Sequence, residues 1–381
     1  MSRPRVFLMN AKNLEKAKQL LADKNKTVLK ATNNLYSQAD KALGSEVFSV
    51  VDKDLIPPSG NKHDYISMGP YWWPNPETED GLPYIQKDGQ VNPEKYKYDH
   101  TKISKMSALV DTLAMAYYFS EEEKYAAHAK KLLYTWFIDD STKMNPHLEY
   151  GQFIPGRCEG RGIGIIETTR LANIVDSIAF LELSKSWTED DQKGMINWFE
   201  LYLQWLLESE KGKEEYNKGN NHGTCYDVQA STFALFTNSN HIARNILSKS
   251  GEKRIASHIE PDGTQPKEMS RTKGLSYSTM NLRAMFKLAV LADNIGIDLW
   301  NYSSGNSGSI KKALDWLIPY YTEKKEWPYQ QIISFNDGRV FELLRMASYY
   351  YDISYEQYIN DLPVSNKNSV RINLKYPKIN N

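Results

Sequence analysis

Residues suited to proton transfer and charge stabilisation gather in the segment 220–277. The segment begins with the sequence Asn-Asn-His-Gly, which contains Asn221 and His222, and it ends with Arg271 and Tyr277. These amide, imidazole, guanidinium and phenol groups match the needs of a β-elimination next to a carboxylate, as in the cleavage of a 4-linked uronate. The C5 proton of such a sugar is barely acidic while the neighbouring C6 carboxylate keeps its charge. The segment therefore predicts a site that neutralises a carboxylate and moves protons.

Each of the four groups has a predicted role in that reaction. Asn221 and Arg271 would hydrogen-bond the carboxylate and stabilise the negative charge that grows there in the transition state. His222 and Tyr277 would transfer protons, because histidine titrates near neutrality and a neighbouring cation favours an ionised phenol. Asn221 could instead be a helix N-cap, and a lone histidine at a helix start is more often a cap or a surface group. Arg271 and Tyr277 downstream favour the catalytic interpretation.

These residues resemble those of the alginate lyase superfamily. Within it the sequence is most similar to the gut-bacterial enzymes of polysaccharide lyase family 38, relatives of the family 5 mannuronate lyases. The resemblance rests on Asn-His-Gly at a predicted helix start and on a later Arg and Leu-x-Tyr, and it extends to the segments 5–8, 64–76 and 154–162. It implies an enzyme that cleaves 4-linked uronates of alginate and leaves 4-deoxy unsaturated ends. Asn221, His222, Arg271 and Tyr277 would be its catalytic residues.

A long loop is predicted to help hold the substrate. Seven prolines lie between Pro57 and Pro93, and a loop of this length inside a compact domain usually has a function. We interpret the segment 57–99 as a lid or cleft wall, against the alternative of a surface segment pinned by its aromatic side chains. Two arginines near a predicted helix start suggest either pairing with Glu159 or an anionic ligand. The predicted substrate-binding residues are Tyr65, Tyr71, Trp72, Trp73, Gln152, Arg157, Arg161 and Gln229.

Composition narrows the function classes. Aromatic residues make up 12% of the 381 residues, which suits a carbohydrate cleft, although most aromatic side chains simply pack. The 47 basic and 47 acidic residues cancel, which argues against general nucleic-acid binding but not against a polyanionic sugar bound by a local cluster of cations. Cys158 and Cys225 make no disulfide framework and no metal spacing, and we favour free thiols. We expect no cofactor and no metal.

The hydrophobic periodicity predicts an all-α fold. We expect a single domain over residues 1–381, an incomplete (α/α) toroid of antiparallel helical hairpins, with a short strand or packed tail at 370–374. No stretch has the apolar length of a transmembrane helix, and no signal peptide is recognised. The resemblance implies a periplasmic or secreted protein, a monomer whose partner is an alginate or related polyuronate oligosaccharide. The predicted helices are 11–44 as two helices or one kinked helix, 103–117, 122–137, 163–183, 189–210, one from 220, 241–249, 251–259, 277–295, 309–321 and 338–351.

Other functions are compatible with parts of the pattern. A glucuronan lyase would use the same residues on a different uronate. A non-catalytic acidic-glycan binding protein would keep the aromatic loop and the arginines but would not need both His222 and Tyr277. A glycoside hydrolase would need two carboxylates across a cleft, and Glu149, Glu159 and Glu268 form no recognisable pair.

Overall fold

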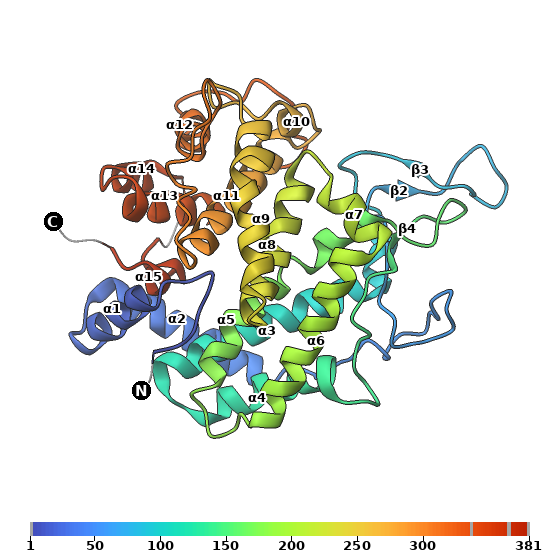
Figure 1. Cartoon of the computed structure of the whole chain (residues 1–381), viewed down its shortest axis with the longest axis horizontal. Coiled ribbons are helices and arrows are strands. Elements are labelled where there is room, and N and C mark those ends of the chain that lie inside the picture. Colours follow the sequence, from blue (N-terminus) through green and yellow to red (C-terminus); the bar gives the residue numbers. More distant parts are fainter. Residues whose placement is uncertain (1–2, 336–337, 364–366, 379–381) are drawn as a thin grey trace. The chain divides into compact units, whose positions relative to one another are not determined.

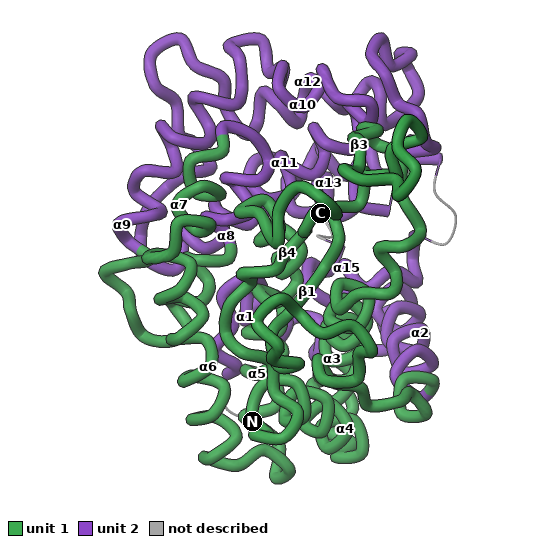
Figure 2. Tube along the Cα trace, turned by 90° about the vertical axis from the view of Figure 1, so that its right-hand side faces the viewer, with its two compact units in different colours: residues 1–2, 41–218, 229–243 green, residues 3–40, 219–228, 244–381 purple. Residues whose placement is uncertain are grey.

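The computed structural model describes residues 3–335, 338–363 and 367–378, most of them in helices (Figure 1). The chain forms two compact units, coloured separately in Figure 2. Of the described residues, unit 1 comprises 41–218 and 229–243, and unit 2 comprises 3–40, 219–228, 244–335, 338–363 and 367–378. A single domain over the whole chain stays a prediction.

Unit 1 is built around a long buried helix. Helix α3 buries Met106, Val110, Leu113 and Tyr117 on the face that the periodicity predicted, and it packs against α4 and α5. Helix α6 starts with a capping box formed by Thr188 and Asp191, which satisfies backbone donors of the first turn. The helices are α3 (Asp99–Ser120), α4 (Glu123–Leu133) continued by a π-helical turn (Tyr134–Ile138), α5 (Leu171–Leu181) preceded by a 3-10 helix (Gly162–Thr168), α6 (Glu189–Glu208) and α7 (Glu210–Tyr216).

The proline-rich segment of unit 1 contains short strands. β1 (Ile66–Met68) pairs in parallel with β4 (Tyr150–Phe153), and β2 (Trp72–Trp73) pairs antiparallel with β3 (Ile85–Gln86). A 3-10 helix (Pro93–Lys97) leads into α3. The buried ammonium group of Lys53 lies 2.7 Å from the Asp99 carboxylate and donates to the Asp64 carbonyl, so both ends of the segment are fixed. The segment is therefore an ordered part of unit 1.

Unit 2 holds both ends of the described chain and most of the predicted catalytic segment. Its elements are α1 (Ala11–Ala22), α2 (Lys26–Leu43) as far as Asp40, the first turns of α8 (Asn221–Phe236), α9 (Asn240–Ser250) from Arg244 and a π-helical turn (Gly251–Ala256), then α10 (Pro266–Met269), α11 (Gly274–Asp293), α12 (Ile310–Tyr321), α13 (Gly338–Tyr350), α14 (Tyr355–Asp361), a 3-10 helix (Lys367–Ser369) and α15 (Ile372–Lys375). Inside this unit the Arg254 guanidinium lies 2.7 Å from the Asp227 carboxylate, and both side chains are 1% exposed. This ion pair joins the π-helical turn to α8.

Most predicted helices are confirmed, and the residues 11–44 form two helices rather than one. Of the two alternatives for residues 370–374, a short strand or a packed tail, the structure shows the packed tail. Arg345 donates from Nη1 to the Asn373 side chain and to the Tyr376 carbonyl, so the tail packs as the helical turn α15 with Ile372 and Leu374 buried. In the part of the chain that the structure describes, no helix combines the length and hydropathy needed to cross a membrane.

Candidate active site

The start of α8 brings the first two predicted catalytic residues into unit 2. The Asn220 side chain accepts a hydrogen bond of 3.2 Å from the His222 backbone, so Asn220 serves as the N-cap. Asn221 is only 1% exposed, and its side chain points to a different partner. The cap and the predicted carboxylate ligand are thus two separate asparagines.

That partner is Glu268 of α10, which the sequence did not single out for this role. Its Oε1 accepts from the Asn221 backbone N–H at 2.6 Å, and its Oε2 accepts from Asn221 Nδ2 at 2.6 Å. Burial raises the pKa of the Glu268 carboxyl, while the hydrogen bonds from Asn221 and the nearby charges of His222 and Arg271 oppose that rise. A carboxylate at this position also meets the positive end of the α8 dipole.

Arg271 and Tyr277 lie against each other in the same unit. The Arg271 guanidinium carbon is 4.4 Å from the centre of the Tyr277 ring, and Nη2 lies 3.4 Å from the phenolic oxygen. The Arg271 backbone N–H donates to the Glu268 carbonyl at 3.2 Å, so the turn after α10 carries the guanidinium. The start of α11 is held by Gln331, whose side chain donates to Ser276 Oγ at 2.8 Å. A cation beside a phenol stabilises the negative charge of a phenolate.

A buried polar network supports these residues. Thr224 on α8 donates its hydroxyl hydrogen to Asn281 Oδ1 at 2.7 Å, so His258 Nδ1, 3.2 Å from the same hydroxyl, must be the donor in that contact. Asn281 donates in turn to the Gln265 side chain at 2.9 Å. Burial, with the charges of Arg254 and Lys267, lowers the pKa of His258 to about 3. The network therefore joins α8, α10 and α11 around a neutral imidazole.

In unit 1 the predicted binding residues form an aromatic and cationic group. The Arg157 and Arg161 guanidinium carbons lie 5.2 Å and 5.7 Å from the centre of a Trp72 ring, within cation–π range. Arg161 also donates from Nη2 to Gln152 Oε1 at 3.0 Å. Tyr71, Trp72 and Trp73 are each half-buried. These side chains offer a partly open surface with two cations.

Three of the predicted binding residues are buried: Gln152 is 6% exposed, and Tyr65 and Gln229 are fully buried. Tyr65 donates to Glu167 at 2.7 Å, and burial with the Glu167 charge raises the pKa of this phenol. Gln229 is bonded to Thr168 and to the Ile165 carbonyl. Their contact with substrate stays a prediction, and the structure gives each an internal partner.

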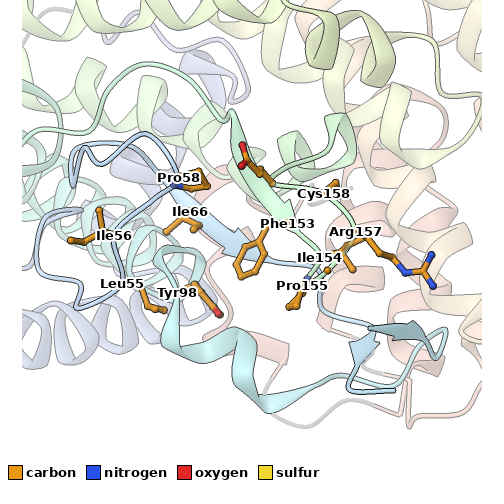
Figure 3. Close-up of a pocket in the computed structure, with 12 residues that line it drawn as sticks. Leu55, Ile56, Pro58, Ile66, Tyr98, Phe153, Ile154, Pro155, Arg157 and Cys158 are labelled. Carbon is orange, nitrogen blue, oxygen red and sulfur yellow. The ribbon is translucent and has the colours of Figure 1, made fainter. Parts of the chain in front are cut away.

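A cavity of about 480 Å³ in unit 1 is lined by one of the predicted binding residues, Arg157 (Figure 3). Its walls are mainly apolar, with Ile66 and Phe153 near its middle and Leu55 at one side. Arg157 lies at the other side in Figure 3. Neither Cys158, which also lines the cavity, nor Cys225 is in a disulfide bond.

Comparison with known proteins shows the family of this chain. A model of the alginate lyase family matches residues 49–327. The crystal structure of an alginate lyase from Bacteroides ovatus is 42% identical to this chain, with a TM-score of 0.94 over 98% of this chain and 99% of that one. Among curated protein sequences, none matches significantly.

More distant structures share the fold. Alginate lyase A1-III from Sphingomonas species A1 is 13% identical, with a TM-score of 0.55 over 90% of this chain and 94% of that one. A histidine-to-alanine variant of alginate lyase A1-III complexed with a tetrasaccharide is also 13% identical, with a TM-score of 0.63 over 97% and 95% of the two chains.

The helical hairpins and the matched family define an all-α polysaccharide lyase of the (α/α) toroid class, as predicted. The chain belongs to the alginate lyase family. Among the described residues, no three or more His, Cys, Asp or Glu side chains are grouped so as to hold a metal ion. The roles of the individual site residues, and independence of metals, stay predictions.

The sequence missed the residues that hold the predicted catalytic groups. The sequence gives Glu268 no role beside Asn221, and its position three residues before Arg271 is the one signal that points to such a role. Gln331 and His258 lie far along the chain from Ser276 and Thr224, so no local pattern connects them.

The buried His258 predicts a pH-dependent stability. In the unfolded chain His258 takes up a proton near pH 6.5, whereas in the folded protein its pKa is about 3. The contribution of His258 to the free energy of unfolding is therefore fully present above pH 6.5. It is lost as the pH falls toward 3, by at most about 1.4 kcal/mol per pH unit. Urea unfolding between pH 7 and 4 should show a shallower loss of stability for His258→Gln than for the unmodified protein. Equal slopes would contradict this assignment.

Proposed function

We propose that this protein cleaves the 4-linked uronates of alginate by β-elimination at a site formed by Asn221, His222, Arg271 and Tyr277. The observation that carries the proposal is the linked set in unit 2: Glu268 bonds Asn221, precedes Arg271 in one turn, and Arg271 covers the Tyr277 ring. The family membership supports the same reaction class. No hydrolytic pair of carboxylates is needed in this account.

The reaction begins with the substrate carboxylate. Asn221 Nδ2 and the Arg271 guanidinium donate hydrogen bonds to the C6 carboxylate, so the charge that develops when C5 loses its proton is stabilised in place. The C5–H electrons form the C4=C5 double bond, and the C4–O4 bond breaks. The leaving O4 then takes up a proton, and the products are a new chain end and a 4-deoxy unsaturated uronate.

Tyr277 supplies the proton to O4. Its phenolic oxygen lies 3.4 Å from Arg271 Nη2, and that cation stabilises the phenolate left after proton transfer. For mannuronate, the C5 proton and O4 lie on the same side of the ring when the carboxylate is held fixed. Tyr277 can then act first as base and afterwards as acid in a syn elimination.

Guluronate requires a second base. It is the C5 epimer of mannuronate, so its C5 proton lies on the side opposite to O4. His222 is half-buried and directly follows Asn221 in the first turn of α8, which supports a role beside Asn221. We assign His222 as base for guluronate, with Tyr277 kept as acid.

The unit 1 residues are proposed to bind uronate sugars of the polymer. Trp72 offers an aromatic face, and Arg157 and Arg161 add two positive charges beside it. A polyuronate carries one carboxylate on every sugar, so such a surface suits this polymer. We also propose that the protein works as a periplasmic or secreted monomer, since a polysaccharide substrate is met outside the cytoplasm.

Product analysis tests the function directly. The purified protein is incubated with poly-mannuronate, poly-guluronate and glucuronan in the presence of excess chelator. Elimination produces a conjugated double bond that absorbs in the ultraviolet, and we expect this absorbance to rise with both alginate polymers. New reducing ends without absorbance would indicate hydrolysis, and activity on glucuronan alone would identify a glucuronan lyase instead.

Replacing Tyr277 with Phe removes the proposed acid with little change in volume. We expect turnover to fall on every substrate, by roughly a hundred- to ten-thousandfold. Initial rates of absorbance change measure the effect. Tyr329→Phe, at a tyrosine that is 47% exposed, is the control and should keep full activity. Near-normal turnover in Tyr277→Phe would remove this residue from the mechanism.

Replacing Asn221 and replacing Arg271 should reduce kcat by different amounts. Asn221→Ala removes one neutral donor and should reduce kcat by roughly a hundredfold or more. Arg271→Ala removes a full charge and also the cation over Tyr277, so its loss should be larger. Arg244→Ala, at an exposed arginine of α9, is the matched control. A larger loss in Asn221→Ala than in Arg271→Ala would contradict the assignment.

The two-base account makes a prediction about substrate preference. His222→Ala should reduce cleavage of poly-guluronate far more than cleavage of poly-mannuronate, because Tyr277 serves as the base for mannuronate. The ratio of kcat/KM on the two polymers measures this, with His241→Ala at an exposed histidine as the control. Equal losses on both polymers would assign His222 to carboxylate binding instead.

A further inference from the structure

We propose that Glu268 is a positioning residue that orients the Asn221 amide, so that its nitrogen rather than its oxygen is presented to a uronate carboxylate. This inference rests on the proposed function, because that function assigns carboxylate binding to Asn221. It adds a residue whose task is to set the direction of a donor and not to touch the sugar.

The hydrogen bonds fix the orientation. Glu268 accepts from both the backbone N–H and the side-chain Nδ2 of Asn221, each at 2.6 Å. An ionised carboxylate has only acceptors, so the amide end that faces it must be the NH2 group. Of the two Nδ2 hydrogens, Glu268 takes one, which leaves the second to be donated to a ligand. The reversed amide would direct its oxygen, an acceptor, at an anionic substrate.

Glu268 acts on the substrate through Asn221. Each of its carboxylate oxygens accepts a hydrogen bond from Asn221, one from the backbone N–H and one from Nδ2. A group in this position can act on the sugar only through the residue that it holds. The same geometry argues against Glu268 as the proton donor of a glycoside hydrolase, which must reach the glycosidic oxygen.

Glu268 also links the two proposed carboxylate ligands. Its backbone carbonyl accepts from the Arg271 N–H at 3.2 Å, while its side chain holds Asn221 on α8. Helix α10 has four residues and begins with Pro266, whose restricted φ favours a helix start. The short helix α10 therefore carries Arg271 on the turn that follows it and fixes Asn221 through the Glu268 side chain.

The charge state of Glu268 decides the orientation. A protonated carboxyl would donate from one oxygen, and the Asn221 amide could then reverse and accept. The two N–H donors and the helix N-terminus favour the ionised form, whereas burial raises the pKa of this carboxyl. The arrangement thus holds above that pKa and fails as the pH falls below it.

Glu268→Gln separates positioning from mere support of the fold. The glutamine is isosteric, but one of its two terminal atoms is a donor. The backbone N–H of Asn221 cannot turn, so the glutamine oxygen remains its acceptor, and the glutamine nitrogen faces the Asn221 side chain. Asn221 then accepts through Oδ1, so both hydrogen bonds survive while the amide is reversed.

We expect this variant to fold normally and to lose activity. Its kcat should fall roughly ten- to a hundredfold, as is typical when the partner that orients a reacting group is changed. KM should change much less, since the donor stabilises charge that grows in the transition state. Its Tm should stay close to that of the unmodified protein. Glu260→Gln, at an exposed glutamate of the same unit, should match the unmodified protein in all three quantities.

A double-mutant cycle shows whether Glu268 acts through Asn221. Adding Glu268→Gln to Asn221→Ala should cause little further loss of kcat, because the amide to be oriented is already absent. A loss in the double variant equal to the product of the two single losses would overturn the proposal. So would a Glu268→Gln variant with kcat within twofold of the unmodified protein.

A measurement without substrate distinguishes this inference from the proposed function. In protein labelled with ¹⁵N-asparagine, the Asn221 side-chain NH2 signals should shift on titration to acidic pH, and Glu268→Gln should abolish that shift. An unmodified protein that shows the titration but releases no unsaturated product would refute the proposed lyase reaction and keep the Asn221–Glu268 geometry. Active enzyme whose Asn221 signals do not respond to Glu268 would refute the positioning role alone.

Discussion

The site in unit 2 depends on the contact between the buried Glu268 carboxylate and the N-terminus of α8. Removing a charged group from water costs several kcal/mol unless hydrogen bonds and nearby positive charge offset it. Glu268 meets this condition through two bonds to Asn221 and through the N-terminus of α8. The turn of α10, the first turn of α8 and the loop with Arg271 must therefore form together. A site of this kind trades some stability for a fixed donor, a common balance in enzymes.

Local patterns indicated the groups that are proposed to react, but they did not indicate the groups that hold them. Helical periodicity gave α3, α6 and α11, and the spacing of Asn221, His222, Arg271 and Tyr277 indicated one site. The partners of these residues are long-range: Glu268 follows Asn221 by 47 positions, and Gln331 follows Ser276 by 55. The sequence also did not show which polar side chains are buried. Gln229, a predicted substrate-binding residue, is bonded to Thr168 and to the Ile165 carbonyl. The choice between a strand and a packed tail at 370–374 stayed open for a similar reason, since Arg345, which bonds to Asn373, lies far away along the chain.

Strand β4 shows that unit 1 also maintains an unfavourable local geometry. Gln152 has a φ of 50°, in the left-handed region that residues other than glycine adopt at a cost. Its backbone N–H donates to Ser67 Oγ at 2.8 Å, and its carbonyl accepts from Arg161 Nε at 2.9 Å. Gly69 makes the close approach possible, because a Cβ there would lie 2.7 Å from the Arg161 guanidinium and from the Trp72 ring. The surface around Trp72 thus depends on the absence of a side chain at Gly69 and on the strained backbone of Gln152.

The nearness of two guanidinium groups to Trp72 has a spectroscopic consequence. Indole fluorescence responds to nearby charge, and the excited-state dipole of this ring lies in the field of Arg157 and Arg161. An anion that draws either guanidinium away would change the emission wavelength and the quenching of this one residue. The other eight tryptophans can be replaced by phenylalanine at the positions where they pack, or the indoles can carry a fluorine label. The signal of Trp72 then reports ligand binding to unit 1. Occupancy of this surface could then be followed in real time, independently of bond cleavage in unit 2.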